Sequence, residues 1–198
     1  MNEVVQSELK KILNGRFSQS ESTRANYARG EDTYDPVLSE AVVFPETNEE
    51  VSKILKLCNE HKIPVVPFGT GTSLEGNVVG NKNGITISLE KMNKVLSVNA
   101  EDFDCRVQAC VTKEQLNEYL REDGVFFPID PGANAAIGGM ASTSASGTMA
   151  VKYGTMKTVI TGLTVVLPNG DIINTGSRTK KTSAGYNLTN LFIGSEGT

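Results

Sequence analysis

The strongest constraint on the fold is a strand–helix–strand pattern between residues 41 and 68. The apolar run Ala41–Pro45 predicts a short strand, and Thr47-Asn48-Glu49-Glu50 after it forms a capping box, which marks the start of a helix. Apolar residues at helical spacing carry this helix to about His61, and Pro64–Phe68 predicts a second buried strand. The pattern indicates a βαβ unit, with a further strand over 84–89 beside it.

The remaining segments predict a mixture of helices and antiparallel strands. We expect an amphipathic helix over the first dozen residues, a polar surface loop over 14–35, and strands over 95–99 and 105–111. A second capping box at Thr112 opens a helix that runs to about Glu122, and Asn169-Gly170 predicts a hairpin. The fold class is therefore α+β. We expect an N-terminal helix and loop over 1–35, one subdomain over 36–94 and a second over 95–198.

Composition excludes several classes of protein. Among 198 residues, 19 Lys and Arg stand against 23 Asp and Glu, and a net charge of −4 does not suit a nucleic-acid or anionic-membrane surface. Three cysteines without ligand spacing do not favour a disulfide scaffold or a metal site. We expect no secretory signal at the N-terminus, and the uncharged stretch 131–151 is too rich in glycine and hydroxyl side chains to span a membrane. We expect a cytoplasmic protein.

The first segment that could carry chemistry is the glycine-rich stretch Phe68–Asn77, directly after a predicted strand. Its glycines let main-chain N–H groups approach an anion, and its Thr and Ser hydroxyls add donors, so it could hold a phosphate or pyrophosphate. It lacks the lysine of a phosphate-binding P-loop and does not open a helix as a dinucleotide fingerprint does. A glycine-rich strand exit with no ligand is the alternative.

The second segment is Asp130–Gly147, in which small residues predominate. Pro131-Gly132 predicts a turn, and Ala135–Ser144 could form a short helix whose N–H groups face a cleft. The lack of bulk would let a flat ring system lie against the backbone. The alternative is close helix–sheet packing with no ligand.

Three quoted stretches together carry a family resemblance: PVVPFGTGTSLEGN, FPIDPGANAAIGGMASTSASGTMAVKYGTM and AGYNLTNLFIGSEGT. From about Tyr34 to the last residue, the chain resembles the FAD-binding domain of the vanillyl-alcohol oxidase type, called the PCMH fold. Within that family it is most similar to D-2-hydroxyacid dehydrogenases, namely glycolate oxidase flavin subunits and above all D-lactate dehydrogenases. The resemblance implies two α/β subdomains with FAD between them.

The resemblance also implies which residues contact FAD. The loop matching Gly69–Gly76 wraps the pyrophosphate, the segment matching Pro131–Thr148 lies along the ribityl chain and the isoalloxazine, and a strand matching Thr158–Gly162 touches the adenine. The cofactor-binding residues implied are Pro67, Gly69, Thr70, Gly71, Thr72, Ser73, Gly76, Asn77, Pro131, Gly132, Ile137, Gly138, Gly139, Thr143, Ser144, Gly147, Thr148, Tyr153, Gly154 and Ile160.

Several relatives carry a flavin-linked histidine where this chain has Thr72, whose hydroxyl cannot make that link. The only histidine is His61, which we expect at an exposed helix end. We therefore predict non-covalent FAD and no metal.

In this family the chain continues into a substrate domain that supplies the substrate-binding arginine, the metal-binding histidines and the base. We expect no catalytic residue in this chain, which resembles the N-terminal flavin-binding portion of a larger enzyme. The resemblance implies hydride transfer from C2 of a small 2-hydroxy acid (D-lactate or glycolate) to flavin N5, an electron acceptor of undetermined identity, and possible homo-oligomers. The alternatives are another substrate on the same fold, as in alkyl-glycerone-phosphate synthase or the enolpyruvyl reductase, and a stand-alone module without cofactor.

Overall fold

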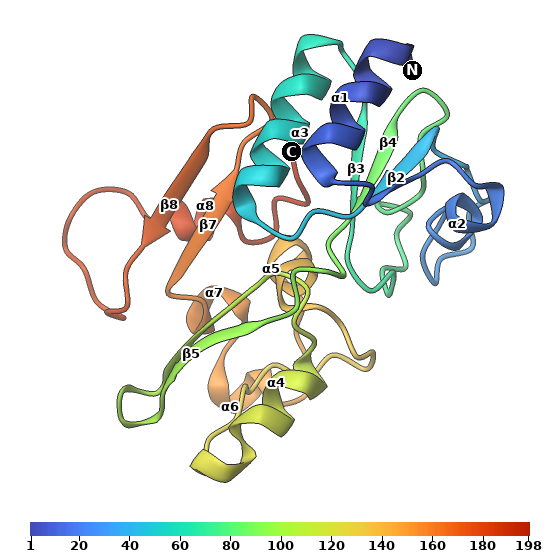
Figure 1. Cartoon of the computed structure of the whole chain (residues 1–198). Coiled ribbons are helices and arrows are strands. Elements are labelled where there is room, and N and C mark those ends of the chain that lie inside the picture. The colour runs from blue at the N-terminus through green and yellow to red at the C-terminus, as the bar shows by residue number, and fades with distance from the viewer. The chain divides into compact units, whose positions relative to one another are not determined.

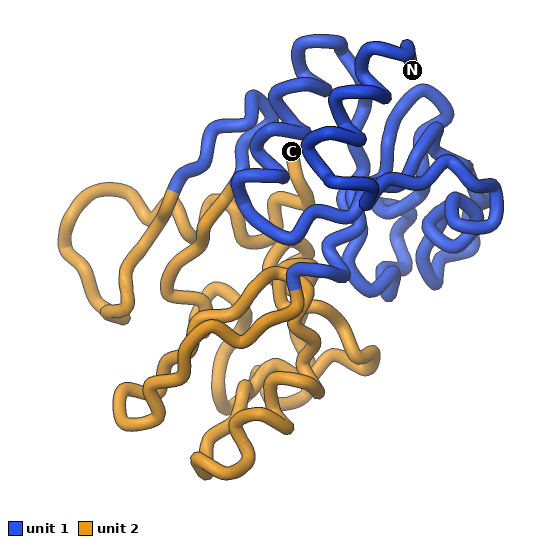
Figure 2. Tube along the Cα trace, viewed as in Figure 1, with its two compact units in different colours: residues 1–92, 166–173 blue, residues 93–165, 174–198 orange.

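The computed structural model describes all 198 residues, and they form two compact units (Figure 2). Unit 1 comprises residues 1–92 and 166–173, and unit 2 comprises residues 93–165 and 174–198. Each unit has its own cluster of buried apolar side chains. Each is therefore described by itself.

Unit 1 is built on a four-stranded sheet with the order β1-β2-β4-β3. The strands are β1 (Phe17–Ser18), β2 (Ala41–Val43), β3 (Val65–Phe68) and β4 (Ile85–Ser88). Both β2 and β3 run parallel to β4, whereas β1 pairs antiparallel with β2. The predicted βαβ unit is confirmed, and β4 lies between its two strands. Every residue of β2 and β4 is buried, as expected for central parallel strands.

Two amphipathic helices, α1 (Glu3–Leu13) and α3 (Asn48–Glu60), lie side by side in unit 1 (Figure 1). The predicted N-terminal helix is thus confirmed. Their apolar faces and the sheet share one core of buried side chains: Val5, Leu9, Leu13, Ala41, Val43, Ile54, Cys58, Ile85 and Ile87.

The segment 14–35, which the sequence predicts to be a loop, contains β1 and a short helix, α2 (Glu21–Asn26). No residue of α2 is buried, so no apolar periodicity marks this helix in the sequence. Its start is fixed instead by Ser20, whose hydroxyl accepts a hydrogen bond from the Thr23 N–H at 3.2 Å.

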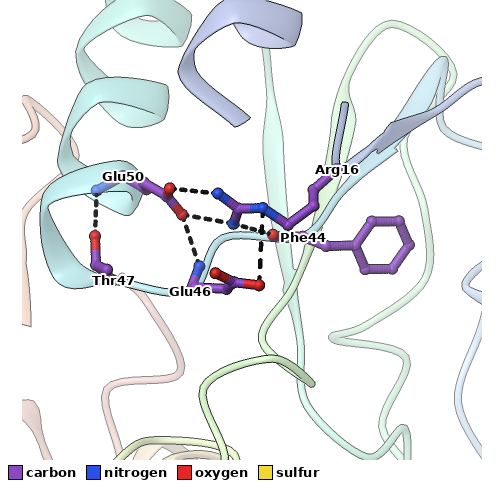
Figure 3. A network of polar contacts seen from close by, with 5 residues as sticks. All are labelled: Arg16, Phe44, Glu46, Thr47 and Glu50. Atoms are coloured by element: carbon purple, nitrogen blue, oxygen red, sulfur yellow. Dashed lines mark hydrogen bonds and ion pairs between the residues drawn. The ribbon is translucent and has the colours of Figure 1, made fainter. Parts of the chain in front are cut away.

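An ion pair joins Arg16, which lies between α1 and β1, to Glu50 in the first turn of α3 (Figure 3). The Arg16 guanidinium donates to both carboxylate oxygens of Glu50 and, at 2.9 Å, to the Phe44 carbonyl. Thr47 caps α3 by accepting from the Glu50 N–H, as predicted. In a capping box the Glu50 carboxylate would accept from the Thr47 N–H. Here this carboxylate is also bound by Arg16, and it accepts from the N–H of the preceding residue, Glu46, at 2.7 Å.

Unit 2 contains an antiparallel strand pair, most of a hairpin that is described below, and several short helices. The pair is β5 (Val95–Asn99) with β6 (Asp104–Val107), and β6 ends at Val107, so the predicted strand over 105–111 is four residues too long. The helices are α4 (Lys113–Leu120), α5 (Ile137–Thr143), α6 (Ala150–Tyr153), α7 (Met156–Val159) and α8 (Leu188–Phe192). Their core includes Val111, Leu116, Leu120, Phe127, Ile129, Ile137, Met140, Ala141, Met156 and Ile193.

The predicted hairpin is confirmed as β7 (Gly162–Val166) paired with β8 (Ile172–Gly176). Gly170 in its turn has φ +83°, the left-handed conformation that Asn-Gly favours. Residues 166–173 at the tip belong to unit 1, where the Ser52 hydroxyl on α3 donates to the Gly170 carbonyl at 2.5 Å. None of the helices has the length and apolar character that a membrane span requires.

Candidate functional site

The glycine-rich loop leaves β3 at Phe68 and presents main-chain donors that the chain itself does not use. From Gly69 to Gly76, no backbone N–H donates a hydrogen bond to another group of the chain. Gly71 (φ +73°) and Gly76 (φ +77°) adopt the left-handed conformation that L side chains rarely take. The Thr70 and Thr72 hydroxyl oxygens are 3.4 Å apart on the same loop. The loop therefore offers a concentrated set of neutral hydrogen-bond donors.

The shape of this loop is fixed from beneath. The Phe68 ring lies under Gly71, where an added Cβ would come within 2.7 Å of Cζ. The Gly71 carbonyl accepts from the Glu31 N–H at 2.9 Å. Ser73 donates through its hydroxyl to Asn77 Oδ1. Pro67, the first predicted cofactor residue, lies exposed in β3 opposite Ile87.

Three residues that support the loop were not predicted from the sequence. Asp32 is 7% exposed and accepts from the N–H groups of Gly30 and Tyr34, both at 3.0 Å. This turn brings Gly30 so close to the loop that an added Cβ would lie 2.6 Å from the Gly71 carbonyl oxygen. The Tyr34 ring packs against Gly76. Gly30-Glu31-Asp32 has the composition of a turn, which was the available signal.

In unit 2, Asp130 is the first residue of the second segment, and its carboxylate contacts the two residues that follow the last one. Its Oδ1 accepts from the Met149 N–H at 3.0 Å, and its Oδ2 accepts from the Thr148 hydroxyl at 2.8 Å. These two hydrogen bonds hold the pKa of Asp130 below its ordinary value. The Lys113 ammonium lies nearby and donates to the Pro131 carbonyl at 3.4 Å.

Helix α5 forms within the predicted range 135–144, but its first N–H groups are partly occupied. The Ile137 N–H donates to the Val111 carbonyl and the Gly138 N–H to the Ala109 carbonyl, both at 2.8 Å. An added Cβ on Gly138 would meet Ala109 Cβ at 2.8 Å. Gly138 therefore serves close packing within the chain, which was the alternative considered for this segment.

Two other glycines of the segment have no such explanation. An added Cβ on Gly132 or on Gly139 would meet nothing within 4 Å. Gly139 is exposed, and its N–H has no acceptor within the chain. Thr143, one turn further on, is also exposed and donates through its hydroxyl to the Gly139 carbonyl at 3.1 Å. These positions leave backbone open to an external group.

The C-terminal stretch packs on the end of α5. The N–H groups of Gly194 and Glu196 donate to the carbonyls of Ala141 and Ser142, at 2.9 and 3.0 Å. Ser144 ends α5 in the left-handed conformation (φ +51°), and an added Cβ on Gly194 would lie 3.2 Å from its Cβ. Two of the three motifs that carry the family resemblance are thus in contact within unit 2.

The last predicted residues lie around α6 and α7. The Tyr153 ring makes an edge-to-face contact with Phe126 (5.5 Å between centroids), and the Lys152 ammonium lies 4.9 Å from the Tyr153 ring centre. Gly154 has φ +86°, and Ile160 is half-buried after α7. Residues 156–159 are helical, so the strand expected over Thr158–Gly162 begins only at Gly162.

The donor set fits FAD and does not offer a general base. Unengaged N–H groups and hydroxyls suit a pyrophosphate, and open glycines suit a flat ring. Neither segment contains a histidine, and the lowered pKa of Asp130 makes its carboxylate a weak base. His61 ends α3 and is exposed, as predicted. No group of three or more His, Cys, Asp or Glu side chains could hold a metal ion.

A family model described as "FAD binding domain" matches residues 39–176. The chain is 46% identical to a mitochondrial D-lactate dehydrogenase [cytochrome] of Arabidopsis thaliana over 97% of its own length, and 50% identical to a probable mitochondrial D-lactate dehydrogenase of Danio rerio over 91%. It is 36% identical to the glycolate oxidase subunit GlcD of Bacillus subtilis over 92% of its length. The chain spans 34%, 37% and 39% of these three relatives.

The fold is also found among solved structures. An alkyldihydroxyacetonephosphate synthase superimposes on the whole chain with a TM-score of 0.87 at 23% identity, and the match covers 38% of that protein. This likeness shows a mixed α+β fold, as the sequence predicts. The family model covers more than half of the chain, and the chain therefore belongs to the FAD-binding domain family.

Proposed function

We propose that this chain binds FAD without a covalent link and forms the flavin-binding part of a D-2-hydroxyacid dehydrogenase or oxidase. The observation that carries the proposal is the loop Gly69–Gly76, where no main-chain N–H is used within the chain and two threonine hydroxyls stand alongside. Such a loop suits the pyrophosphate of a dinucleotide.

The roles proposed for the residues follow the two segments. Gly69–Ser73 and Gly76 donate main-chain N–H groups to the pyrophosphate, with Thr70 and Thr72 adding hydroxyls. Gly132 and Gly139 leave room for the ribityl chain and the isoalloxazine, and the Gly139 N–H is available to a flavin acceptor. Because Thr72 cannot form a histidyl link, the cofactor is released by denaturation. The division into FAD-binding subdomains over 36–94 and 95–198 is part of this proposal.

The proposed reaction belongs to the whole enzyme. A bound FAD would supply the hydride-accepting chemistry needed to oxidise a 2-hydroxy acid at C2. This chain holds and orients the cofactor, and the rest of the enzyme contributes the base and the substrate-binding residues. The names of the relatives, D-lactate dehydrogenase and glycolate oxidase subunit, support D-lactate or glycolate as substrate, with a separate electron acceptor. Two of these relatives are named as mitochondrial, so the cytoplasmic location stays a prediction.

The test is to measure FAD binding by the purified chain. We expect quenching of FAD fluorescence on titration, flavin absorbance that stays with the protein on gel filtration, and release of all the colour by acid precipitation. The variant Thr70→Val/Thr72→Val removes both loop hydroxyls and should weaken binding. A chain that remains colourless and does not bind added FAD would contradict the proposal and favour a module without cofactor. Colour that stays with the acid precipitate would contradict non-covalent binding.

The substrate is tested on the full-length enzyme. D-lactate, glycolate and other 2-hydroxy acids are supplied with an artificial electron acceptor, and the reduction of that acceptor is followed. Reduction with D-lactate or glycolate is the expected result. Activity only with an alkyl-glycerone-phosphate type of substrate would favour the alternative enzyme on the same fold.

A further inference from the structure

We propose that Asp130 is a positioning residue, which closes the segment Pro131–Thr148 into a loop of fixed shape and so prepares it for the flavin. The proposal rests on the proposed FAD binding and extends it to a residue that does not itself contact the cofactor. It makes a single carboxylate responsible for holding the two ends of the flavin segment together.

Asp130 directly precedes the segment Pro131–Thr148, and its carboxylate contacts two residues at the other end, Thr148 and Met149. One carboxylate oxygen accepts from the Met149 N–H at 3.0 Å and the other from the Thr148 hydroxyl at 2.8 Å. A carboxylate that uses both oxygens in this way fixes two residues at once, because hydrogen bonds to a charged acceptor are stronger than neutral ones. The two ends of the segment are therefore held together by one side chain.

The close approach at Gly147 is a second, independent observation of the same junction. A Cβ added there would lie 2.2 Å from the Asp130 carbonyl oxygen and 2.2 Å from Asp130 Oδ1. Such a contact is impossible for any residue except glycine. The main chain at 147 therefore lies directly against Asp130, and the small residue at this position is explained by the junction rather than by the flavin.

The rest of the segment is attached elsewhere in unit 2. Its middle is held by hydrogen bonds from Ile137 and Gly138 to the 109–111 backbone, and the end of α5 by the Gly194 and Glu196 N–H groups. Asp130 itself is half-buried and outside the apolar core. Loss of the Asp130 contacts should thus leave unit 2 folded but free the ends of the segment, so FAD must order them on binding.

The experiment compares the wild-type chain with Asp130→Asn and with the pair Thr148→Val and Thr148→Ser. Asp123→Asn is the matched control, since Asp123 is an exposed acid of the same unit whose carboxylate forms no ion pair and accepts no hydrogen bond. We measure the FAD dissociation constant, the shape of the bound-flavin absorbance band, and hydrogen exchange of the Met149 amide in the FAD-free protein.

We expect Asp130→Asn to raise the FAD dissociation constant about tenfold or more, because an ordering cost is added to binding. Met149 should exchange faster in this variant before any FAD is added. Thr148→Val should also speed the exchange of the Met149 amide in the FAD-free protein and weaken FAD binding by a smaller factor, whereas Thr148→Ser keeps the hydroxyl and should keep this exchange slow. Asp123→Asn should leave all three measurements unchanged. The Thr148 pair decides the matter if Asp130→Asn does not fold.

Two results would overturn the inference. Wild-type FAD affinity and flavin spectrum in both Asp130→Asn and Thr148→Val would show that the junction does not position the segment. An equal loss of FAD affinity in Thr148→Ser and Thr148→Val would show that the hydroxyl contact is not responsible. Failure of the wild-type chain to bind FAD is a different result, which removes the proposed function and this inference with it.

Discussion

The substitution Gly139→Ala should change the stability of the FAD-free chain and its affinity for FAD in opposite directions. Gly139 lies inside helix α5, is exposed, and an added Cβ would meet no atom within 4 Å. Its φ is not in the left-handed region, so alanine fits the backbone. Because glycine in a helix interior is about 0.5–1 kcal/mol less favourable than alanine, Gly139→Ala should stabilise the FAD-free chain by about that amount.

The expected gain corresponds to a rise of about 1–4 °C in the melting temperature, given roughly 2–4 °C per kcal/mol for a chain of this size. Scanning calorimetry or circular dichroism of the FAD-free protein measures it. The same methyl group would occupy the space proposed for the flavin and shield the Gly139 N–H. We therefore expect FAD affinity, measured by fluorescence titration, to fall about tenfold, which corresponds to about 1.4 kcal/mol.

The neighbouring glycine provides the matched control. An added Cβ on Gly138 would lie 2.8 Å from Ala109 Cβ and 2.9 Å from its carbonyl oxygen, so Gly138→Ala should destabilise the FAD-free chain by about 1–3 kcal/mol through overpacking. We therefore expect Gly138→Ala to lower the stability of the FAD-free chain and Gly139→Ala to raise it. Unchanged FAD affinity in Gly139→Ala would refute the proposed use of the open space, and a loss of stability there would refute the structural argument.

Three further predictions concern unit 1. The hydrogen bond from Arg16 lowers the pKa of the Glu50 carboxyl, so the ion pair stabilises the fold above the carboxyl's unfolded pKa, and this stability is lost as pH falls through the folded pKa. Urea unfolding at pH 7 should therefore show a free energy of unfolding about 1–2 kcal/mol lower for Glu50→Gln than for the wild type, and this difference should shrink in acid. Ser52→Ala removes the buried hydroxyl that donates to the Gly170 carbonyl and should lower the free energy of unfolding by about 1–2 kcal/mol. Thermal melting measures this loss, with Ser22→Ala as the exposed control. Burial raises the pKa of the Cys58 thiol to about 11, so a thiol reagent at pH 8 should modify Cys58 only after unfolding, as peptide mapping would show; rapid labelling of the native chain would contradict its burial.

The elements predicted correctly are those whose signal is local. The capping boxes at Thr47 and Thr112 mark real helix starts, because the threonine hydroxyl bonds an N–H only three residues away. The Asn169-Gly170 turn is equally local. The position of β4 between β2 and β3 depends on pairing of residues twenty or more positions apart, which no short pattern specifies.

The sequence predicts the two segments of the candidate site, but it does not predict the residues that hold the glycine-rich loop in place. Asp32 and Gly30 lie in a polar stretch without periodicity, and their importance for the glycine-rich loop arises from tertiary contact with Gly71. Likewise, the small side chains of the second segment have two different causes. Gly138 and Gly147 are small because the chain packs against itself, whereas Gly132 and Gly139 face open space, and only coordinates distinguish these cases.

The hairpin of β7 and β8 gives the chain an interlaced connectivity. The polypeptide passes from unit 1 to unit 2 after Met92, returns for residues 166–173, and leaves again, so neither unit corresponds to one continuous stretch. A gene fragment that stops at Met92 would omit the strip carrying Gly170, and Ser52 would lose its acceptor. Dissection of this protein into halves should therefore begin from permuted chains, in which 166–173 is rejoined to the first ninety-two residues by a short linker.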